Sequence, residues 1–523
     1  MKSTISILII MLLLLTPPIA NAGVFYCTDG DTTCLIDAIN TSNANDQKDT
    51  IYLTKHGTYT LTTSDALGGS QGPTGLPSIT SEIRIYGKGS TIQRSTAEGT
   101  PDFRIMHVAS SGKLKLKDVV IKNGRATAAD IRSGRNCGGI MTLRGSSLYI
   151  HKSVISNNYA DFLGGGVCIA KGVIKDSTIS NNVSATNAGG ITHGAIESGG
   201  KDKVDIINSI ISDNTAIAYA GGGIFNGNGG AINIVGSTIT GNTGTVGGGI
   251  ANISIGSDTD YGTMLTIKDS VISGNFGGFG GGIYNNIGEV VVTNSLITNN
   301  SSNNNGAGIG NTRVGKLIVN DSCIFDNFAA ITSVFNSNPV PNIPTPVMDA
   351  RNNWWGASDG PSGVGPGSGD SVSTNIDFIP FLTSLVPACM REISIDIKPG
   401  NKHNVVNPRS KGGIWVAVLS ETNHESPFDP SSQVDIPTVE FGPDGAKAIR
   451  HKVKDINKDG IGDLLLRFKI PDTGIEYGDT EATLTGKTFD NQLFTGTDFI
   501  KTVGCKPKKH NKKEHHDHAH KVH

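Results

Sequence analysis

The sharpest chemical motif in this sequence is a nine-residue run of acidic, amide and glycine residues at 455–463, with the sequence DINKDGIGD. Side-chain oxygens stand at positions 1, 3, 5 and 9, a glycine that allows a sharp turn stands at position 6, and position 7 offers a main-chain carbonyl. This order of oxygen ligands is typical of loops that bind Ca²⁺. The sequence therefore predicts structural calcium held by Asp455, Asn457, Asp459, Ile461 and Asp463.

One ligand of a full EF-hand loop is missing from this run. Leu466 stands at position 12, where a bidentate glutamate is expected. Glu476, Asp479 or water are the candidates that would complete the coordination shell. The alternative interpretation is an ordinary turn, because Asp, Asn and Gly are also common turn residues.

A second segment with metal-binding side chains follows Cys505, where the chain ends KPKKHNKKEHHDHAHKVH. Six of the 13 histidines lie here, between six lysines. Such a composition cannot bury a core, so we expect residues 506–523 to be disordered. Imidazoles on a flexible tail suit Zn²⁺, Ni²⁺ or Cu²⁺, and the candidate ligands are His515, His516, His518 and His520. The alternative is a solvated, weakly basic tail that adheres to anionic surfaces.

Side chains suited to acid–base catalysis are concentrated between residues 125 and 161. They are Arg125, Asp130, Arg132, Arg135, Arg144, His151 and Asp161. A polysaccharide lyase would combine carboxylates that bind Ca²⁺ with an Arg or Lys base. The alternative is that these charges solvate a long loop, since exposed charge is the surface norm. His193 and Tyr219 lie in other long segments without an evident partner, so no catalytic residue is assigned.

The N-terminal segment 1–22 has the features of a secretory signal peptide. Lys2 is its only charge, an apolar run extends from Ile5 to Leu15, and Ala20-Asn21-Ala22 precedes Gly23. Export permits disulfides among the seven cysteines. We expect Cys27 to pair with Cys34 across a short turn, and Cys389 to pair with Cys505 across the last folded segment. Cys137, Cys168 and Cys323 are interpreted as small packed residues whose pairing stays open.

The elements that must position these residues follow from an internal repeat. Eight similar segments superpose one isoleucine each, at 121, 155, 179, 211, 239, 272, 297 and 324, with a mean spacing of 29 residues. A second series lies between them, in which two glycines precede a β-branched residue at 140, 167, 191, 224, 250 and 283, with a Gly-Ala-Gly variant before Ile309. Two interleaved series with one mean period indicate one structural coil per repeat.

Each repeat has the alternation of extended chain. In 265–275, Leu265, Ile267, Ser270 and Ile272 can all point to one side. Asn275 falls at the following bend, where asparagine tolerates a left-handed conformation and can hydrogen-bond its counterpart in the next coil. The glycines allow tight turns and close approach of neighbouring coils. We therefore predict an all-β, right-handed parallel β-helix.

Both ends of the repeat resemble secreted β-helix proteins. Residues 33–39, TCLIDAI, are similar to the CSLREA motif that opens many bacterial secreted β-helix proteins, and residues 352–356, NNWWG, resemble their terminal coil. The resemblance implies a pectin-lyase-like solenoid. We expect 31–41 to form a helix that covers the first coil. We expect Trp354 and Trp355 to close the far end of the core, the alternative being a sugar-stacking platform.

The repeat stops before Ile393, and short alternating strands separated by turn residues predict an antiparallel β-sandwich up to Cys505. Its segments ISIDIKPGN, NPRSKGGIWVAVL and DINKDGIGDLLLRF resemble an accessory domain found at the C-termini of many bacterial secreted proteins, which lends no established activity. The predicted domains are the signal peptide 1–22, an N-terminal cap with irregular coils 23–110, the β-helix 111–388, the β-sandwich 389–505 and the tail 506–523.

Composition narrows the function. Lys and Arg number 44 against 46 Asp and Glu in 523 residues, so we do not expect an electrostatic nucleic-acid binder. After the signal peptide, no apolar stretch is long enough to span a membrane. Asn, Ser, Thr and Gly dominate the repeat, and these residues are poor acids and bases but hydrogen-bond hydroxyl-rich ligands.

We therefore expect a non-enzymatic, monomeric, exported protein that acts in adhesion or in contact with surface or extracellular polysaccharide. Its compartment is the periplasm, the cell surface or the extracellular space. The alternative is a polysaccharide lyase or glycoside hydrolase that acts on an extracellular polysaccharide.

Overall fold

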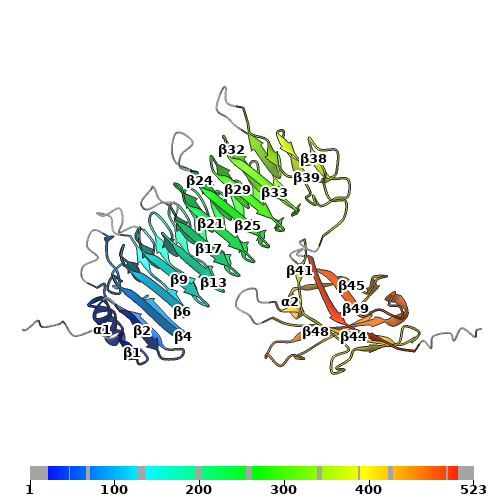
Figure 1. Cartoon of the computed structure of the whole chain (residues 1–523), viewed down its shortest axis with the longest axis horizontal. Coiled ribbons are helices and arrows are strands. Elements are labelled where there is room, and N and C mark those ends of the chain that lie inside the picture. The colour runs from blue at the N-terminus through cyan, green and yellow to red at the C-terminus, as the bar shows by residue number, and fades with distance from the viewer. Residues whose placement is uncertain are drawn as a thin grey trace, which may run out of the picture. The chain divides into compact units, whose positions relative to one another are not determined.

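The computed structural model describes residues 22–504 apart from 46, 66–70, 128–135, 195–201, 255–261, 338–343, 387–388, 422–427 and 490–492. The chain divides into two compact units, Met1–Ser384 and Leu385–His523, so the division comes four residues before the predicted one (Figure 1). Residues 1–21 of the predicted signal peptide 1–22 and the predicted His-rich tail 506–523 lie outside the described residues. In the described part of the chain, no helix is long and apolar enough to cross a membrane.

The first unit is a right-handed parallel β-helix, as the repeat predicts. A typical coil contributes two consecutive strands to a long sheet, called sheet 1 here, and one strand each to sheets 2 and 3. Figure 1 shows the strands of successive coils stacked from β1 to β38 and β39. Every backbone N–H and C=O along a strand can thus bond to the coils on either side, which leaves edges only at the two ends.

Sheet 1 contains β1 (Val24–Cys27), β2 (Lys48–Leu53), β3 (Thr58–Leu61), β4 (Glu82–Arg94), β6 (Lys113–Lys122), β9 (Ser147–His151), β10 (Val154–Ser156), β13 (Gly172–Lys175), β14 (Thr178–Ser180), β17 (Lys203–Ile207), β18 (Ile210–Ser212), β21 (Ala231–Val235), β22 (Thr238–Thr240), β25 (Met264–Lys268), β26 (Val271–Ser273), β29 (Glu289–Thr293), β30 (Leu296–Thr298), β33 (Lys316–Asn320), β34 (Cys323–Phe325), β37 (Met348–Asp349) and β40 (Ile376–Asp377).

Sheet 2 contains β7 (Arg125–Ala126), β11 (Tyr159–Ala160), β15 (Val183–Ser184), β19 (Thr215–Ala216), β23 (Thr243–Val246), β27 (Phe276–Phe279), β31 (Ser301–Ser302) and β35 (Phe328–Ala329). Sheet 3 contains β5 (Met106–Val108), β8 (Ile140–Thr142), β12 (Val167–Ile169), β16 (Ile191–His193), β20 (Ile224–Gly227), β24 (Ile250–Ile253), β28 (Ile283–Asn286), β32 (Ile309–Thr312), β36 (Val334–Ser337), β38 (Pro361–Gly363) and β39 (Gly369–Val372).

The strand register confirms both series of the repeat. The isoleucines of the first series stand opposite one another without a break, at 121, 155, 179, 211, 239, 272, 297 and 324. The second series is in register in sheet 3 from Ile140 to Ile309. All these side chains are buried in one core, which therefore consists of continuous aliphatic columns.

An asparagine ladder runs through the bend between sheets 1 and 2. Its members are Asn158, Asn182, Asn214, Asn242, Asn275, Asn300 and Asn327, and each Nδ2 donates to the Oδ1 of the next at 2.9–3.0 Å. The ladder forms at the asparagines that the sequence predicts, but the residue with the left-handed conformation is not the predicted one. Positive φ falls one position earlier, at Asn157, Asn181, Asp213, Gly241, Gly274, Asn299 and Asp326, with φ of 55–65°. Asn275 thus forms the ladder while Gly274 makes the bend.

The glycines before each sheet-3 strand face the backbone of the next coil. A Cβ added to Gly248 would lie 2.2 Å from the carbonyl oxygen of Phe276, and one added to Gly222 would lie 2.3 Å from that of Gly248. Real Cβ atoms do not approach backbone atoms so closely. The missing side chain therefore lets consecutive coils stack at this corner.

The N-terminal end of the β-helix is covered by α1 (Thr32–Asn43), with Asp31 as its N-cap. Its Leu35, Ala38 and Ile39 are buried in the β-helix core, so the predicted cap is confirmed. At the other end Trp355 is fully buried in the same core, while Trp354 is partly exposed. Trp355 therefore closes the end of the core, as predicted, and its buried ring is not available to stack on a sugar.

The disulfides partly correct the sequence interpretation. Cys27 and Cys34 are bridged. Cys137 and Cys168, which the sequence left as packed thiols, also form a disulfide, and Cys323 is disulfide-bonded rather than free. Cys389 is disulfide-bonded, but its predicted partner Cys505 lies outside the described residues. Cys137 and Cys168 carry no local sequence signal for pairing, because it is the stacking of consecutive coils that brings them together.

The second unit is a sandwich of two mainly antiparallel sheets around a separate core. One sheet contains β41 (Arg391–Glu392), β50 (Leu493–Phe499), β49 (Glu481–Thr488), β45 (Val434–Phe441) and β46 (Ala446–Lys447). The other, called sheet 4 here, contains β42 (Ile395–Ile397), β44 (Gly413–Val418), β48 (Asp463–Lys469) and β47 (Arg450–Lys454). The strands β43 (Val405–Val406) and β51 (Lys501–Thr502) pair separately, and α2 (Pro430–Gln433) and η4 (Ile470–Asp472) connect strands.

Candidate functional site

The predicted calcium loop connects β47 to β48 in the second unit. The buried Asp463 accepts hydrogen bonds on both carboxylate oxygens. Its Oδ1 accepts from the backbone N–H of Ser420 at 2.7 Å and from its hydroxyl at 2.8 Å, and its Oδ2 accepts from the backbone N–H groups of Ile456 and Asn457. These four donors occupy the carboxylate, so Asp463 holds the loop in place and has little capacity left for a cation.

The other predicted ligands remain at the outer side of the loop. Asp455 accepts from the backbone N–H groups of Lys458 and Gly460, which is the turn that an EF-hand-like loop makes around its first ligand. Hydrogen bonds from the backbone of Ile461, from Ser420 and from Asn457 lower the pKa of Asp459, which keeps its carboxylate ionised. The donor set that fits Ca²⁺ is thus Asp455, Asn457, Asp459 and the Ile461 carbonyl.

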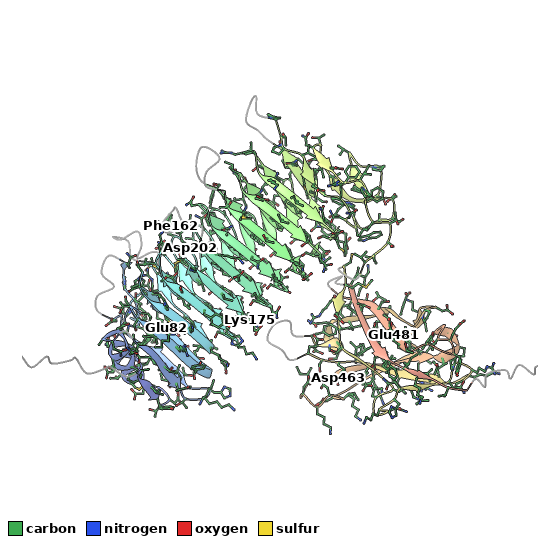
Figure 2. All side chains as sticks on the ribbon, viewed as in Figure 1. Glu82, Phe162, Lys175, Asp202, Asp463 and Glu481 are labelled. Carbon is green, nitrogen blue, oxygen red and sulfur yellow. A yellow bond between two sulfur atoms is a disulfide. The ribbon has the colours of Figure 1, made fainter. Side chains whose placement is uncertain are left out.

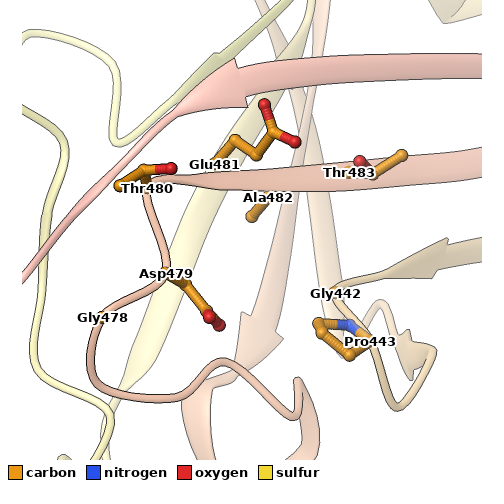
Figure 3. Close-up of a pocket in the computed structure, with 8 residues that line it drawn as sticks. All are labelled: Gly442, Pro443, Gly478, Asp479, Thr480, Glu481, Ala482 and Thr483. Carbon is orange, nitrogen blue, oxygen red and sulfur yellow. The ribbon is translucent and has the colours of Figure 1, made fainter.

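Glu476 and Asp479 follow the opposite end of β48 from this loop, and a seven-residue strand separates the two ends. Asp479 instead lines a shallow pocket of about 480 Å³ together with Glu481, Thr480 and Thr483 (Figure 3). In the part of the chain that the structure describes, no three His, Cys, Asp or Glu side chains are grouped to hold a metal. A calcium ion at 455–461 would therefore need water to complete its shell.

Calcium is expected to stabilise the second unit through this loop. At free Ca²⁺ ten times above Kd, mass action raises the free energy of unfolding by about 1.4 kcal/mol. Replacing Asp455 and Asp459 by asparagine should abolish this gain, because it removes both charges that attract the ion. Thermal unfolding of the mature protein in Ca²⁺ and in chelator, with calorimetry, measures the effect.

The control for that experiment is Asp472→Asn, an exposed carboxylate in η4 outside the loop. The outcome that would contradict calcium binding is the absence of both signals, the heat of binding and the shift in unfolding temperature, at a Ca²⁺ concentration of about 10⁻³ M. The run 455–463 would then be an ordinary turn. The proposed transition-metal ligands His515, His516, His518 and His520 lie outside the described residues.

The described members of the charged set that the sequence considers for catalysis come from different sheets of the coil. Arg125 in sheet 2 binds Asp102, with Nε 2.9 Å from Oδ2, and its guanidinium lies 4.5 Å from the ring centroid of Tyr159. His151 ends a strand of sheet 1 and pairs with Asp176, with Nε2 3.0 Å from Oδ2. These are different faces of the coil, so the structure does not combine them in one site.

The remaining members of that set are equally dispersed. Arg144 follows a strand of sheet 3, and Asp161 follows a strand of sheet 2. His193 is buried, with its two ring nitrogens facing the carbonyl oxygens of Ile169 and Asp202, while Tyr219 is exposed. Asp130, Arg132 and Arg135 lie outside the described residues.

The structure brings together one Ser–His pair that the sequence did not suggest. Ser78 Oγ lies 2.8 Å from Nδ1 of the buried His107, and the buried Arg104 is close enough to act on its charge. Burial and then Arg104 lower the pKa of His107 to about 4. An imidazole with that pKa is a weak general base, so the pair does not support a serine hydrolase.

The most distinctive surface of the β-helix is the outer face of sheet 1 in its first coils. Three rows of outward side chains run across the strands there. They are Lys48–Glu82–Lys113–Ser147, Thr50–Arg84–Lys115–Tyr149–Val173, and Tyr52–Tyr86–Lys117–His151–Lys175. Figure 2 shows Glu82 and Lys175 on this part of the sheet. We call the cations Lys48, Arg84, Lys88, Lys113, Lys115, Lys117 and Lys175 the basic face.

Carboxylates are few on the basic face. Glu82 is shared by three cations, with oxygen–nitrogen distances of 3.6 Å to Arg84, 3.8 Å to Lys113 and 3.6 Å to Lys115. Asp118 is exposed beside Lys117, and Asp176 pairs with His151. A surplus of positive charge therefore remains on the sheet.

A tyrosine stack borders this face at its N-terminal end. The rings of Tyr26, Tyr52 and Tyr86 follow one another with centroids 5.2 Å apart and interplanar angles of 14° and 19°. The Nζ of Lys88 lies 5.7 Å from the Tyr52 ring, and that of Lys117 lies 5.9 Å from the Tyr86 ring. The faces of Tyr52 and Tyr86 contact neighbouring rings and lysines, so these two tyrosines position lysines, while Tyr26 at the end of the stack is largely exposed.

The same rows lose their surplus of positive charge in later coils. The middle row continues as Asp205, Asn233, Thr266, Val291 and Ile318. Lys203 is paired with Asp205 at 2.8 Å and Lys316 with Glu289 at 2.7 Å. The basic face is therefore local to the first coils and is not a general property of the repeat.

No protein-family model and no curated protein matches the sequence. Among solved structures, the chain is similar to the crystal structure of pectate lyase Pel9A, with 11% sequence identity, a TM-score of 0.35, and coverage of 70% of this chain and 80% of that chain. With so low a TM-score we infer nothing from this likeness, and we identify the β-helix from the strand register of the chain itself. The resemblances to CSLREA-type proteins and to the accessory domain stay predictions.

The asparagine ladder ends on a carboxyl group. Asn327 donates from Nδ2 to Oδ2 of Asp370 at 2.8 Å, and its backbone N–H faces the same carboxyl group. Burial raises the pKa of Asp370 to about 7, and the nearby charge of Asp326 adds to the rise. In the unfolded chain an aspartate has its ordinary pKa of about 4. Folding therefore keeps a proton on Asp370 that the unfolded chain has released.

Acid is expected to stabilise the terminal coil for this reason. A folded-state pKa above the unfolded value gives stability that is complete below about pH 4 and is lost as pH rises to about 7, at up to about 1.4 kcal/mol per pH unit. Asp370→Asn keeps an Oδ1 acceptor for Asn327 and should remove this pH dependence. Amide exchange in 327–372 between pH 4 and 8 measures it, with the exposed Asp377→Asn as control. An unchanged pH profile in Asp370→Asn would refute the assignment.

Proposed function

We propose that this chain is an exported, non-enzymatic β-helix protein that binds acidic surface or extracellular polysaccharide and so acts in adhesion or glycan contact. The observation that carries the proposal is the basic face, where Arg84, Lys113, Lys115 and Lys117 project from two adjacent strands of a regular sheet. Neighbouring strands lie about 4.8 Å apart, so the cations form a lattice that an extended polymer with regularly spaced carboxylates can follow.

Catalysis is not supported by the same surface. Glu82 is bound to three cations on the basic face, and His151 is bound to Asp176. Elimination from a uronate would need an Arg or Lys base beside a group of carboxylates that hold Ca²⁺; the basic face supplies such cations, so the carboxylates decide the question. Among the described residues the acidic side chains are not grouped in that way. Binding without cleavage is the function that fits these side chains.

Binding to an acidic polymer is expected to be salt-dependent and to require the basic face. The triple variant Lys113→Gln, Lys115→Gln, Lys117→Gln should bind polygalacturonate at least tenfold more weakly than the parent, a loss of about 1.4 kcal/mol. A neutral dextran of similar length should bind neither protein. Titration of the mature protein at several ionic strengths, with assay of unsaturated and reducing ends, tests both binding and cleavage.

The matched control is Lys203→Gln, Lys268→Gln, Lys316→Gln, which makes the same charge change on strands of sheet 1 in later coils. It should bind as the parent does. Equal losses in the two triple variants would show that net charge, not this face, drives binding. Release of unsaturated or reducing ends would instead identify a lyase or hydrolase, and tighter binding to duplex DNA of equal charge would contradict the choice of ligand.

A further inference from the structure

Two cations lie against one tryptophan in the second unit, and a third stands beside them on the same sheet face. Trp415 points outward from β44 in sheet 4, directly opposite Arg467 on β48. The Nζ of Lys452 on β47 lies 4.8 Å from the indole centroid, and the guanidinium carbon of Arg467 lies 5.9 Å from it. Arg450 on β47 stands opposite Arg467 on the other side. We call Trp415, Arg450, Lys452 and Arg467 the Trp415 cluster.

The charges of the Trp415 cluster are not compensated within the described part of the chain. None of its three cations forms an ion pair with a described carboxylate, whereas Arg391 pairs with Glu421 and Lys447 with Glu440 in the same unit. Like charges directly opposite on neighbouring strands are destabilising. Arg450 facing Arg467 thus costs stability unless an anion lies between them.

A buried donor in the cluster is also unpaired. The Nε of Arg467 is shielded from solvent and has no hydrogen-bond partner among the described residues. Gly413 makes room for it, since a Cβ there would lie 2.7 Å from that nitrogen. An unpaired buried donor costs about 1–3 kcal/mol. The facing arginines favour an anion outside the protein, and the room over Gly413 lets the Arg467 side chain lie close to the sheet with its guanidinium on that outer face.

Blocking of the sheet edge explains only part of this arrangement. β47 is an edge strand, and lysines on edge strands prevent pairing with another chain. That role accounts for Lys452 and Lys454, but it requires neither an arginine on the inner strand β48 nor a glycine beneath its guanidinium. The ring of Trp415 carries cations close to it, which makes insertion into a membrane costly.

We propose that the Trp415 cluster binds a phosphate group through the guanidinium forks of Arg450 and Arg467, with Lys452 as a third positive charge. Arginine presents parallel N–H donors that match the oxygens of a phosphate, and Trp415 supplies an apolar wall that lowers the local dielectric. The phosphate can be free or carried on an envelope or extracellular glycan. This site is built from other residues than the basic face and is proposed for a different anion.

The test uses the full mature protein and calorimetry at constant ionic strength, with inorganic phosphate, a phosphate-substituted dextran and unsubstituted dextran as probes. The parent should bind a phosphate probe, and Arg450→Gln should weaken that binding at least tenfold. Arg467→Lys keeps the charge but removes the fork, and it should also weaken binding at least tenfold. Lys454→Gln, an equal charge change on the same strand, should have no effect.

The outcomes separate the sources of the phosphate and the two proposed sites. Binding of inorganic phosphate alone supports the cluster as a small-ion site, and tighter binding of phosphate-dextran supports a glycan. Arg467→Lys should keep its affinity for polygalacturonate, and the basic-face triple variant should keep its affinity for phosphate. The proposal is overturned if neither phosphate probe binds, or if Arg467→Lys binds as well as the parent while thermal unfolding shows both proteins folded.

Discussion

Replacement of Gly248 by alanine is expected to destabilise the β-helix by about 3 kcal/mol or more. The new Cβ would lie 2.2 Å from the carbonyl oxygen of Phe276 and 2.7 Å from that of Gly281, both backbone atoms of the next coil. A side chain could rotate away from such a clash, but these atoms belong to stacked strands. The coils must therefore separate locally, which breaks the hydrogen bond from the Gly248 N–H to Gly280, now 3.1 Å long.

Gly262→Ala is the control for this substitution, because nothing lies within 4 Å of a Cβ added at that residue. It should change the unfolding temperature little or even raise it, since alanine restricts the unfolded chain. Urea unfolding with amide exchange of the coils that flank residue 248 measures the difference. Comparable stability of the two variants would mean that the corner adapts and that glycine is not required there.

Asn275→Ala is expected to destabilise the protein by about 3 kcal/mol through the loss of buried hydrogen bonds. Its Oδ1 accepts from the backbone N–H and the Nδ2 of Asn242, and its Nδ2 donates to the carbonyl of Ile239 and to Asn300. Alanine leaves the N–H of Asn242 and the carbonyl of Ile239 without these partners. Neither group has access to water, so the full cost of an unsatisfied polar group applies.

The comparison is Asn233→Ala, which removes one hydrogen bond to Asp205 on the partly exposed outer face of sheet 1. It should cost less than about 1 kcal/mol. Stacked repeats do not always unfold in one step, so local amide exchange in coils 239–302 is the appropriate measurement alongside global unfolding. If the two asparagine variants lose equal stability, the ladder contributes no more than a surface contact.

The core could be predicted from the sequence because each coil repeats its own pattern. Ile239 and Ile272 can be aligned by eye, and stacking then makes them neighbours without any knowledge of distant contacts. The sequence predicts the left-handed position one residue too late, at Asn275, because Gly274 and Asn275 both tolerate positive φ. Only the competing hydrogen bonds of the ladder decide which of them bends.

The candidate sites were less accessible to sequence reasoning because they depend on which strands become neighbours. In the sequence, the alternation of Lys113, Lys115 and Lys117 indicates only an ordinary strand. The basic face becomes visible when the register places these lysines beside Arg84 and Lys175. Ser420, far from the 455–463 run in sequence, occupies the carboxylate of Asp463 that was expected to bind calcium. Opposite pairing of Arg450 with Arg467 likewise follows from a register that no local pattern indicates.

The unbroken asparagine ladder has a consequence for how such a chain can change in length. Every rung joins equivalent atoms of two consecutive coils, so deletion of one whole period, for instance residues 239–271, would leave Asn214 facing Asn275 and Ile211 facing Ile272. A deletion that removes part of the strands of a coil would place unlike residues in the ladder and in the aliphatic column at once, whereas the unequal lengths of the coils show that changes between the strands leave the register intact. Duplication and loss of entire coils are therefore the steps by which the stack can change its length, and they are also the natural units for redesigning its reach.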